Sequence, residues 1–72
     1  MRYKCNIAFI TIEHSFLEEL GFSSYHVIKY NKFGRLAKCG QTICDSKNGI
    51  RIPLTLKKAQ KIRLEEMKKF GL

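Results

Sequence analysis

The chain has 72 residues, of which 14 are lysine or arginine and six are aspartate or glutamate, giving a formal net charge of +8. This length predicts a single small domain over residues 1–72, and the 44% hydrophobic content excludes a disordered tail. We expect a cytoplasmic protein without membrane contact, because no apolar run reaches the ~18 residues of a membrane span, no signal-peptide pattern is present, and the odd number of cysteines favours reduced thiols.

The first predicted element is a strand from Tyr3 to Ile12, because apolar and β-branched side chains occupy both of its faces. A buried helix is the competing interpretation of this stretch. A short helix is expected next. Ser15 and Glu18 have the spacing of a capping box, and Gly21 is placed to end that helix in the left-handed conformation.

Three extended segments with turns between them are expected in the middle of the chain. Residues 31–34 form a plausible first turn, and residues 45–49 contain Asn-Gly, a strong hairpin signal. Gly40 predicts a bulge or a close backbone approach, and Pro53, which lacks a backbone donor, predicts that its strand is an edge strand or ends there. The segments are Tyr25 to Tyr30, Leu36 to Cys44 and Ile50 to Leu54.

The last predicted element is a helix from about Leu56 to Phe70, with Thr55 as its N-cap and Gly71 past its end. Apolar residues at helical spacing predict its buried stripe. They are Leu56, Ala59, Ile62, Met67 and Phe70. The sequence therefore predicts an α+β fold: an antiparallel sheet of about four strands, in β-α-β-β-β-α order, packed against a C-terminal helix.

Positive charge is concentrated in the second half of the chain. Between Lys29 and Arg63 there are ten basic residues and a single acid, Asp45. Charge of one sign in such density attracts polyanions and accelerates their encounter. The sequence therefore predicts an anionic partner, either nucleic acid or an acidic protein surface.

The start of the last helix carries Lys57, Lys58 and Lys61, although the helix macrodipole is already positive there. One interpretation is a phosphate-binding helix N-terminus. The other is that solvated lysines tolerate a small penalty that salt reduces further.

The two predicted turns are also basic and carry aromatic residues. Lysine and arginine would hold the phosphate backbone while Phe33, at a turn tip, accepts an unpaired base. The alternative is that Tyr25 and Tyr30 are ordinary cross-strand residues and the lysines protect strand edges. The predicted nucleic-acid-binding residues are Lys29, Lys32, Phe33, Arg35, Lys38, Lys47, Arg51, Lys57, Lys58 and Lys61.

Metal binding and catalysis have little support in the sequence. Cys39 and Cys44 have the upper limit of a usable zinc-ligand spacing, and Cys5, His14 or His26 could complete a site. No Cys-x2-Cys or His-x3-His pair occurs, and no phosphate loop, paired carboxylates or nucleophile motif is present. We therefore expect no metal, no cofactor and no enzymatic activity.

Two families show a similar order of elements. From Ser15 onward, the predicted order resembles a double-stranded RNA-binding domain, and residues 56–61 (LKKAQK) are similar to its basic helix start, which would carry the phosphate contacts. From Tyr25 onward, three strands and a helix resemble the arm-binding domains of phage integrases. That resemblance implies that Lys29, Lys38 and Arg51 enter the major groove.

Two functional hypotheses follow. The first is a basic module that binds RNA or DNA phosphates without catalysis. The second is a small inhibitor or adaptor, of the type found among phage-encoded modulators, which docks on an acidic surface through an aromatic hot spot at Phe33 or Tyr30. A homodimer formed through an exposed strand edge is compatible with either.

Overall fold

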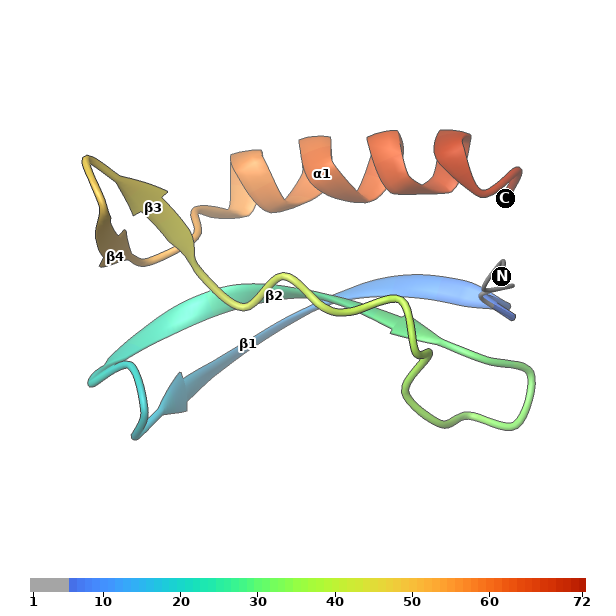
Figure 1. Ribbon diagram of the computed structural model, residues 1–72, viewed down its shortest axis with the longest axis horizontal. Helices are drawn as coiled ribbons and strands as arrows, with labels where there is room; N and C mark the ends of the chain where they lie inside the picture. The colour runs from blue at the N-terminus through green and yellow to red at the C-terminus, as the bar shows by residue number, and fades with distance from the viewer. Residues whose placement is uncertain (1–5) are drawn as a thin grey trace.

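The computed structural model describes residues 6–72. The elements in chain order are β1 (Phe9–Leu17), β2 (Phe22–Tyr30), β3 (Asp45–Lys47), β4 (Ile50–Ile52) and α1 (Leu56–Lys69). β1 and β2 form a long antiparallel hairpin, α1 lies across one face of it, and β3 and β4 form a second hairpin beside the start of α1 (Figure 1). This is a small α+β architecture, as expected, but its observed order is β-β-β-β-α.

The prediction for the first twenty residues is wrong in two respects. The strand begins at Phe9 and continues through Ser15, where a helix was expected; residues 3–5 of the predicted strand lie outside the described residues. Nine residues of β1 pair in unbroken register with β2, from Phe9 opposite Tyr30 to Leu17 opposite Phe22. A one-turn helix makes few backbone hydrogen bonds, so this long ladder outweighs the capping-box signal.

A four-residue turn joins β1 to β2. The N–H groups of Leu20 and Gly21 both donate to the carbonyl of Leu17, at 3.1 and 2.9 Å. Gly21 has φ +77°, a conformation that glycine adopts without a steric penalty. Gly21 therefore adopts the left-handed conformation that was predicted, although it ends the turn of a hairpin rather than a helix.

Residues 36–44 run alongside β2 without forming the regular strand that was predicted. Val27 and Thr42 exchange backbone hydrogen bonds of 2.8 and 3.2 Å, and the Ala37 N–H donates to the carbonyl of Lys29. Between these points the side-chain amide of Gln41 replaces a peptide group. Its Oε1 accepts from the Lys29 N–H, and its Nε2 donates to the carbonyls of Lys29 (3.4 Å) and Ala37 (3.1 Å). The side chain interrupts the backbone ladder but satisfies the same groups.

The β3–β4 hairpin forms where the Asn-Gly signal placed it. Asn48 and Gly49 have φ of +52° and +77°, as a two-residue hairpin turn with positive φ at both positions requires. The chain after this hairpin is fastened to β2. The Leu54 N–H donates to Ser24 Oγ at 2.8 Å, and the Tyr25 N–H donates to the Leu54 carbonyl at 3.2 Å.

Helix α1 begins and ends close to its predicted bounds. Thr55 is the N-cap, and its hydroxyl accepts from the Lys58 N–H at 3.2 Å. The core beneath the helix is a cluster of buried apolar side chains. Its members are Ile10, Val27, Leu54 and Ala59, with Ile62 and Met67 packed against them. Leu56 does not belong to this stripe, because 44% of its surface is exposed.

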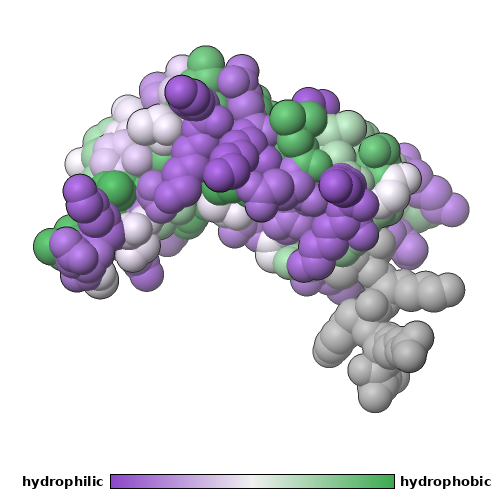
Figure 2. Space-filling view, turned by 90° about the horizontal axis from the view of Figure 1, so that it is seen from above, coloured by the Kyte–Doolittle hydropathy of each residue, from purple (hydrophilic) through white to green (hydrophobic). Residues whose placement is uncertain are grey.

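The outer surface on the α1 side is mainly polar. Figure 2 shows hydrophilic side chains covering most of the middle of this face, with hydrophobic side chains gathered toward its margins. Within residues 6–72, no helix combines the length and the apolar character needed to cross a membrane.

Candidate nucleic-acid interface

The structure places nine of the ten predicted binding residues, all but Lys29, in two groups. The hairpin–helix end contains Lys47 and Arg51 from the β3–β4 hairpin with Lys57, Lys58 and Lys61 from α1. The loop end contains Lys32, Phe33, Arg35 and Lys38. These groups lie at opposite ends of a molecule that is 32 Å in its longest dimension (Figure 1), so they cannot form one compact site.

Lys58 is the member of the hairpin–helix end that is already paired. Its Nζ lies 2.8 and 2.7 Å from the two carboxylate oxygens of Asp45. These hydrogen bonds from Lys58, followed by that from the Ser46 N–H, lower the pKa of Asp45 below its ordinary value. The pair also joins the β3–β4 hairpin to the first turn of α1. Lys58 therefore positions the basic residues around it rather than offering a free charge.

The remaining cations of this end face solvent. Lys47, Arg51, Lys57 and Lys61 are all exposed, and the first turn of α1 contains no acidic residue. Lys57 and Lys61 are one helical turn apart, about 6 Å along the axis, on the side of α1 opposite the buried Ala59. This row of charge is not compensated by any acid on the first helical turn.

Lys29 does not lie in the candidate interface. It is only 5% exposed, because its position in β2 faces α1. Its Nζ donates to the Gly40 carbonyl at 3.0 Å, lies 3.5 Å from Glu66 Oε1, and sits 5.8 Å from the centroid of the Phe70 ring. A charge with these internal partners does not reach a ligand phosphate.

Arg63 is a second cation that serves the fold. Its Nε donates to the carbonyl of Ile10 at 2.7 Å, which connects α1 to β1. Sequence reasoning did not identify this contact or the Glu66 partner of Lys29. The partners are separated by 53 and 37 residues, and no local pattern encodes contacts at such distances along the chain.

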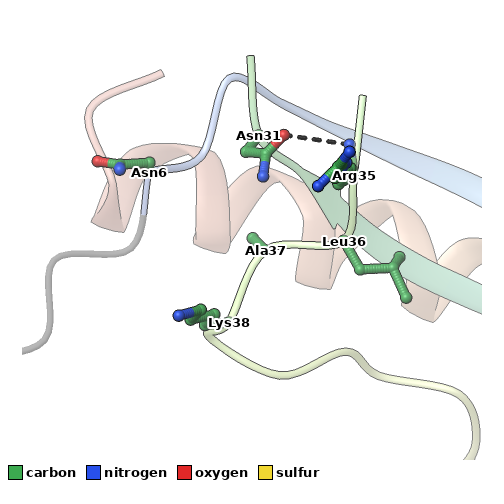
Figure 3. A pocket seen from close by; sticks show the side chains of 6 residues that line it. All are labelled: Asn6, Asn31, Arg35, Leu36, Ala37 and Lys38. Atoms are coloured by element: carbon green, nitrogen blue, oxygen red, sulfur yellow. Dashed lines mark hydrogen bonds between the residues drawn. The ribbon is translucent and has the colours of Figure 1, made fainter. Parts of the chain in front are cut away.

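The loop end is built around Asn31. Its Oδ1 accepts from the N–H groups of Phe33 (2.9 Å) and Arg35 (3.1 Å), which closes the predicted turn. Phe33 is 75% exposed at its tip, as expected for an uncovered aromatic, and Lys32 Nζ lies 5.2 Å from its ring centroid. A hollow of about 350 Å³ adjoins this turn (Figure 3). It is lined by Asn6, Asn31, Arg35, Leu36, Ala37 and Lys38.

Tyr25 and Tyr30 are cross-strand residues. Tyr30 stacks on Phe9 with ring centroids 5.1 Å apart, and its hydroxyl donates to Glu13 Oε2 at 2.6 Å. This hydrogen bond raises the pKa of Tyr30. Tyr25 contacts the ring of His14 at 4.5 Å. Of the three aromatic residues considered, Phe33 is therefore the one presented to a ligand.

The cysteines correct one expectation. Cys39 is disulfide-bonded and Cys44 is free, so the prediction that the thiols are reduced is wrong for Cys39. Within residues 6–72, no cluster of three or more His, Cys, Asp or Glu side chains suited to a metal ion occurs. His26, a candidate ligand, is instead buried in β2, and its Nε2 has no hydrogen-bond partner in that part of the chain.

Comparisons of this chain with protein-family models, with curated proteins and with solved structures found no match. The double-stranded RNA-binding order required a helix after Ser15, and β1 occupies that position. The integrase-like order required a strand at residues 36–44, which pair with β2 only at isolated bridges. Neither resemblance therefore supports a functional assignment, which must come from the charged surface itself.

Proposed function

We propose that this chain is a nucleic-acid-binding module, without catalysis, that contacts phosphates through its hairpin–helix end. The observation that carries this proposal is the exposure of Lys47, Arg51, Lys57 and Lys61 around a single acid that is already paired with Lys58. A free acid would neutralise part of this surface. Here the acid instead fixes the hairpin against the helix, so the exposed charges keep a defined arrangement.

The chemistry of such a surface is sequence-independent attraction. Each lysine or arginine that neutralises a phosphate releases condensed counterions, so affinity falls as salt rises. Full engagement of the four exposed cations on duplex DNA would give a slope of log affinity against log salt of about −3.6, at −0.9 for each contact. Backbone N–H groups at the start of α1 favour a phosphate at the same end.

The test compares two double variants that remove the same amount of charge. Lys57→Ala with Lys61→Ala alters the hairpin–helix end, whereas Lys32→Ala with Arg35→Ala alters the loop end. Fluorescence anisotropy is measured with matched duplex RNA, duplex DNA and single strands over a range of salt. The first variant should flatten the salt slope by about 2, one unit for each lost phosphate contact, and the second should leave it nearly unchanged.

Equal losses in the two variants would show that binding follows net charge alone, and the proposed interface would then be wrong. Binding that is weak for every nucleic acid and vanishes at physiological salt would reject nucleic acid as the partner. The form bound most tightly identifies whether RNA or DNA, and single or double strands, are recognised.

The second candidate function is docking on an acidic protein surface, as an inhibitor or adaptor. The observation that favours it is Phe33, which is 75% exposed beside Lys32 and Arg35 at the loop end. Exposed aromatics flanked by cations are suited to act as binding hot spots. In this case Phe33→Ala would abolish the protein complex, and Lys57→Ala with Lys61→Ala would leave it intact.

A further inference from the structure

β1 is a strand with one open edge. It pairs with β2 on one side, and within residues 6–72 no strand pairs with its other side. The opposite edge of β2 is covered by residues 36–44 and by Leu54. Residues 13–16 of β1 are all exposed. The open edge therefore lies at the surface of the molecule and is accessible.

The register identifies which backbone groups point outward from this edge. Val27 exchanges both of its hydrogen bonds with Thr42, so its backbone groups point away from β1. Ile12 lies opposite Val27, so the two residues form a non-hydrogen-bonded pair. In such a pair the backbone N–H and C=O groups of both residues point away from each other, and those of Ile12 therefore point outward. By alternation, His14 does the same. The Ile10 carbonyl is taken by Arg63, which leaves the stretch from Ile12 onward for a new strand.

Most of the usual protection of an open edge is missing here: the one charged side chain of β1, Glu13, accepts a hydrogen bond from the Tyr30 hydroxyl of β2. Natural proteins place lysine, proline or a bulge on such edges to prevent pairing. The chain has 14 lysines and arginines, yet β1 contains neither of these residues and no proline, and its register is unbroken over nine residues. Phe16, next to the open groups, is 59% exposed. These features favour pairing rather than opposing it.

Charge complementarity identifies the strand that fits. Residues 9–21 hold Glu13, Glu18 and Glu19 and no lysine or arginine, and Glu18 and Glu19 lie in the turn that follows β1. Lys32 lies at the other end of β1, where it lines a small hollow with residues 6–8. In an antiparallel arrangement of two copies, the acidic turn of each would face Lys32 of the other. A second copy of this chain therefore supplies the matching charges twice, and these two contacts outweigh the one like-charge pair that Glu13 of the two copies makes at the centre.

We propose that the open edge of β1 pairs antiparallel with β1 of a second copy, centred between Ile12 and His14. The two sheets then form one continuous sheet through the dimer. The interface is isologous, because the same residues contribute from both copies. This inference does not depend on the proposed nucleic-acid binding, because none of the residues at the hairpin–helix end takes part.

Sedimentation equilibrium from micromolar to millimolar concentration tests the dimer, with two edge variants. His14→Pro removes an outward N–H and no hydrogen bond to β2, and Phe16→Lys places a protective charge on the edge. Each should weaken dimerisation at least tenfold, which corresponds to about 1.4 kcal/mol. Circular dichroism checks that the variants fold. If His14→Pro fails to fold, Phe16→Lys alone still tests the dimer.

A charge-exchange experiment tests the arrangement. Glu18→Lys with Glu19→Lys, and Lys32→Glu in a second chain, should each dimerise more weakly than the wild type, because like charges then face one another. An equimolar mixture should recover the wild-type association, since both contacts of the mixed dimer are attractive. A wild-type chain that stays monomeric throughout, or a dimer that neither the edge variants nor the charge exchange affects, would overturn the proposal.

Discussion

The ion pair between Lys29 and Glu66 gives the strongest test of how α1 is held on the sheet. The Lys29 side chain is 6% exposed and that of Glu66 is 21% exposed. Glu66→Ala would leave the ammonium of Lys29 in the core with the Gly40 carbonyl as its remaining oxygen partner. An unpaired buried charge is costly because it has lost its hydration without gaining a counter-charge.

The loss of stability expected for Glu66→Ala follows from the burial of the Lys29–Glu66 pair. Removing one member of a buried ion pair costs roughly 3–5 kcal/mol. Because the Glu66 side chain keeps a fifth of its exposure, water can partly replace it, and we expect the lower end, about 3 kcal/mol. A domain of this size loses roughly 4–8 °C of melting temperature per kcal/mol, so the expected decrease is about 12–24 °C.

Urea unfolding followed by circular dichroism measures this cost, with a double variant as the matched control. Lys29→Met with Glu66→Leu removes both charges and keeps the volume, and apolar replacement of a whole buried pair is often neutral or stabilising. The double variant should therefore be more stable than Glu66→Leu alone, and a double-mutant cycle that includes the single variants Lys29→Met and Glu66→Leu would report this difference as coupling. A cost below about 1 kcal/mol for Glu66→Ala, as for an exposed pair, would refute the reasoning.

Three further predictions follow from the contacts described. Gln41→Ala should cost about 2 kcal/mol, because it removes three hydrogen bonds to the backbone of β2 and the adjoining loop; hydrogen exchange at the Lys29 N–H should accelerate, and unchanged exchange would contradict this role. The lowered pKa of Asp45 means that its stabilisation is present above its ordinary pKa of 3.8 and is lost as pH falls through the lowered value; Asp45→Asn should remove this acid dependence in pH-dependent unfolding. Alkylation followed by mass spectrometry should modify Cys44 before reduction and Cys39 only afterwards, since Cys39 is bonded and Cys44 is free; modification of Cys39 before reduction would contradict the disulfide.

The elements that were predicted correctly are those specified by neighbouring residues. Thr55 as N-cap and Gly71 past the end bracket α1 within one residue of its expected bounds. Asn48 and Gly49 determine the second hairpin, because both adopt positive φ. These signals act over a few residues, and at these two places no distant segment overrides them.

The errors arise where a distant segment determines the conformation. The stretch around Ser15 has a genuine capping-box spacing, but it extends β1 because β2 is available to pair with it. Residues 36–44 have strand character, but Gln41 takes the place of a peptide group in the ladder. Lys29 was placed in the binding site because its charge is visible in the sequence while Glu66, its partner, is 37 positions away.

The two proposals make a joint prediction about where nucleic acid can bind. The hairpin–helix end lies at the same end of the molecule as the β1–β2 turn (Figure 1). An antiparallel pairing of β1 would therefore place the hairpin–helix ends of two copies far apart, and it would bring each acidic turn to Lys32 at the loop end of the other copy. The loop end would be partly covered in the dimer while the hairpin–helix end stays open. Phe16→Lys should then leave the anisotropy response of each hairpin–helix end intact, while two copies bind one long duplex independently instead of cooperatively.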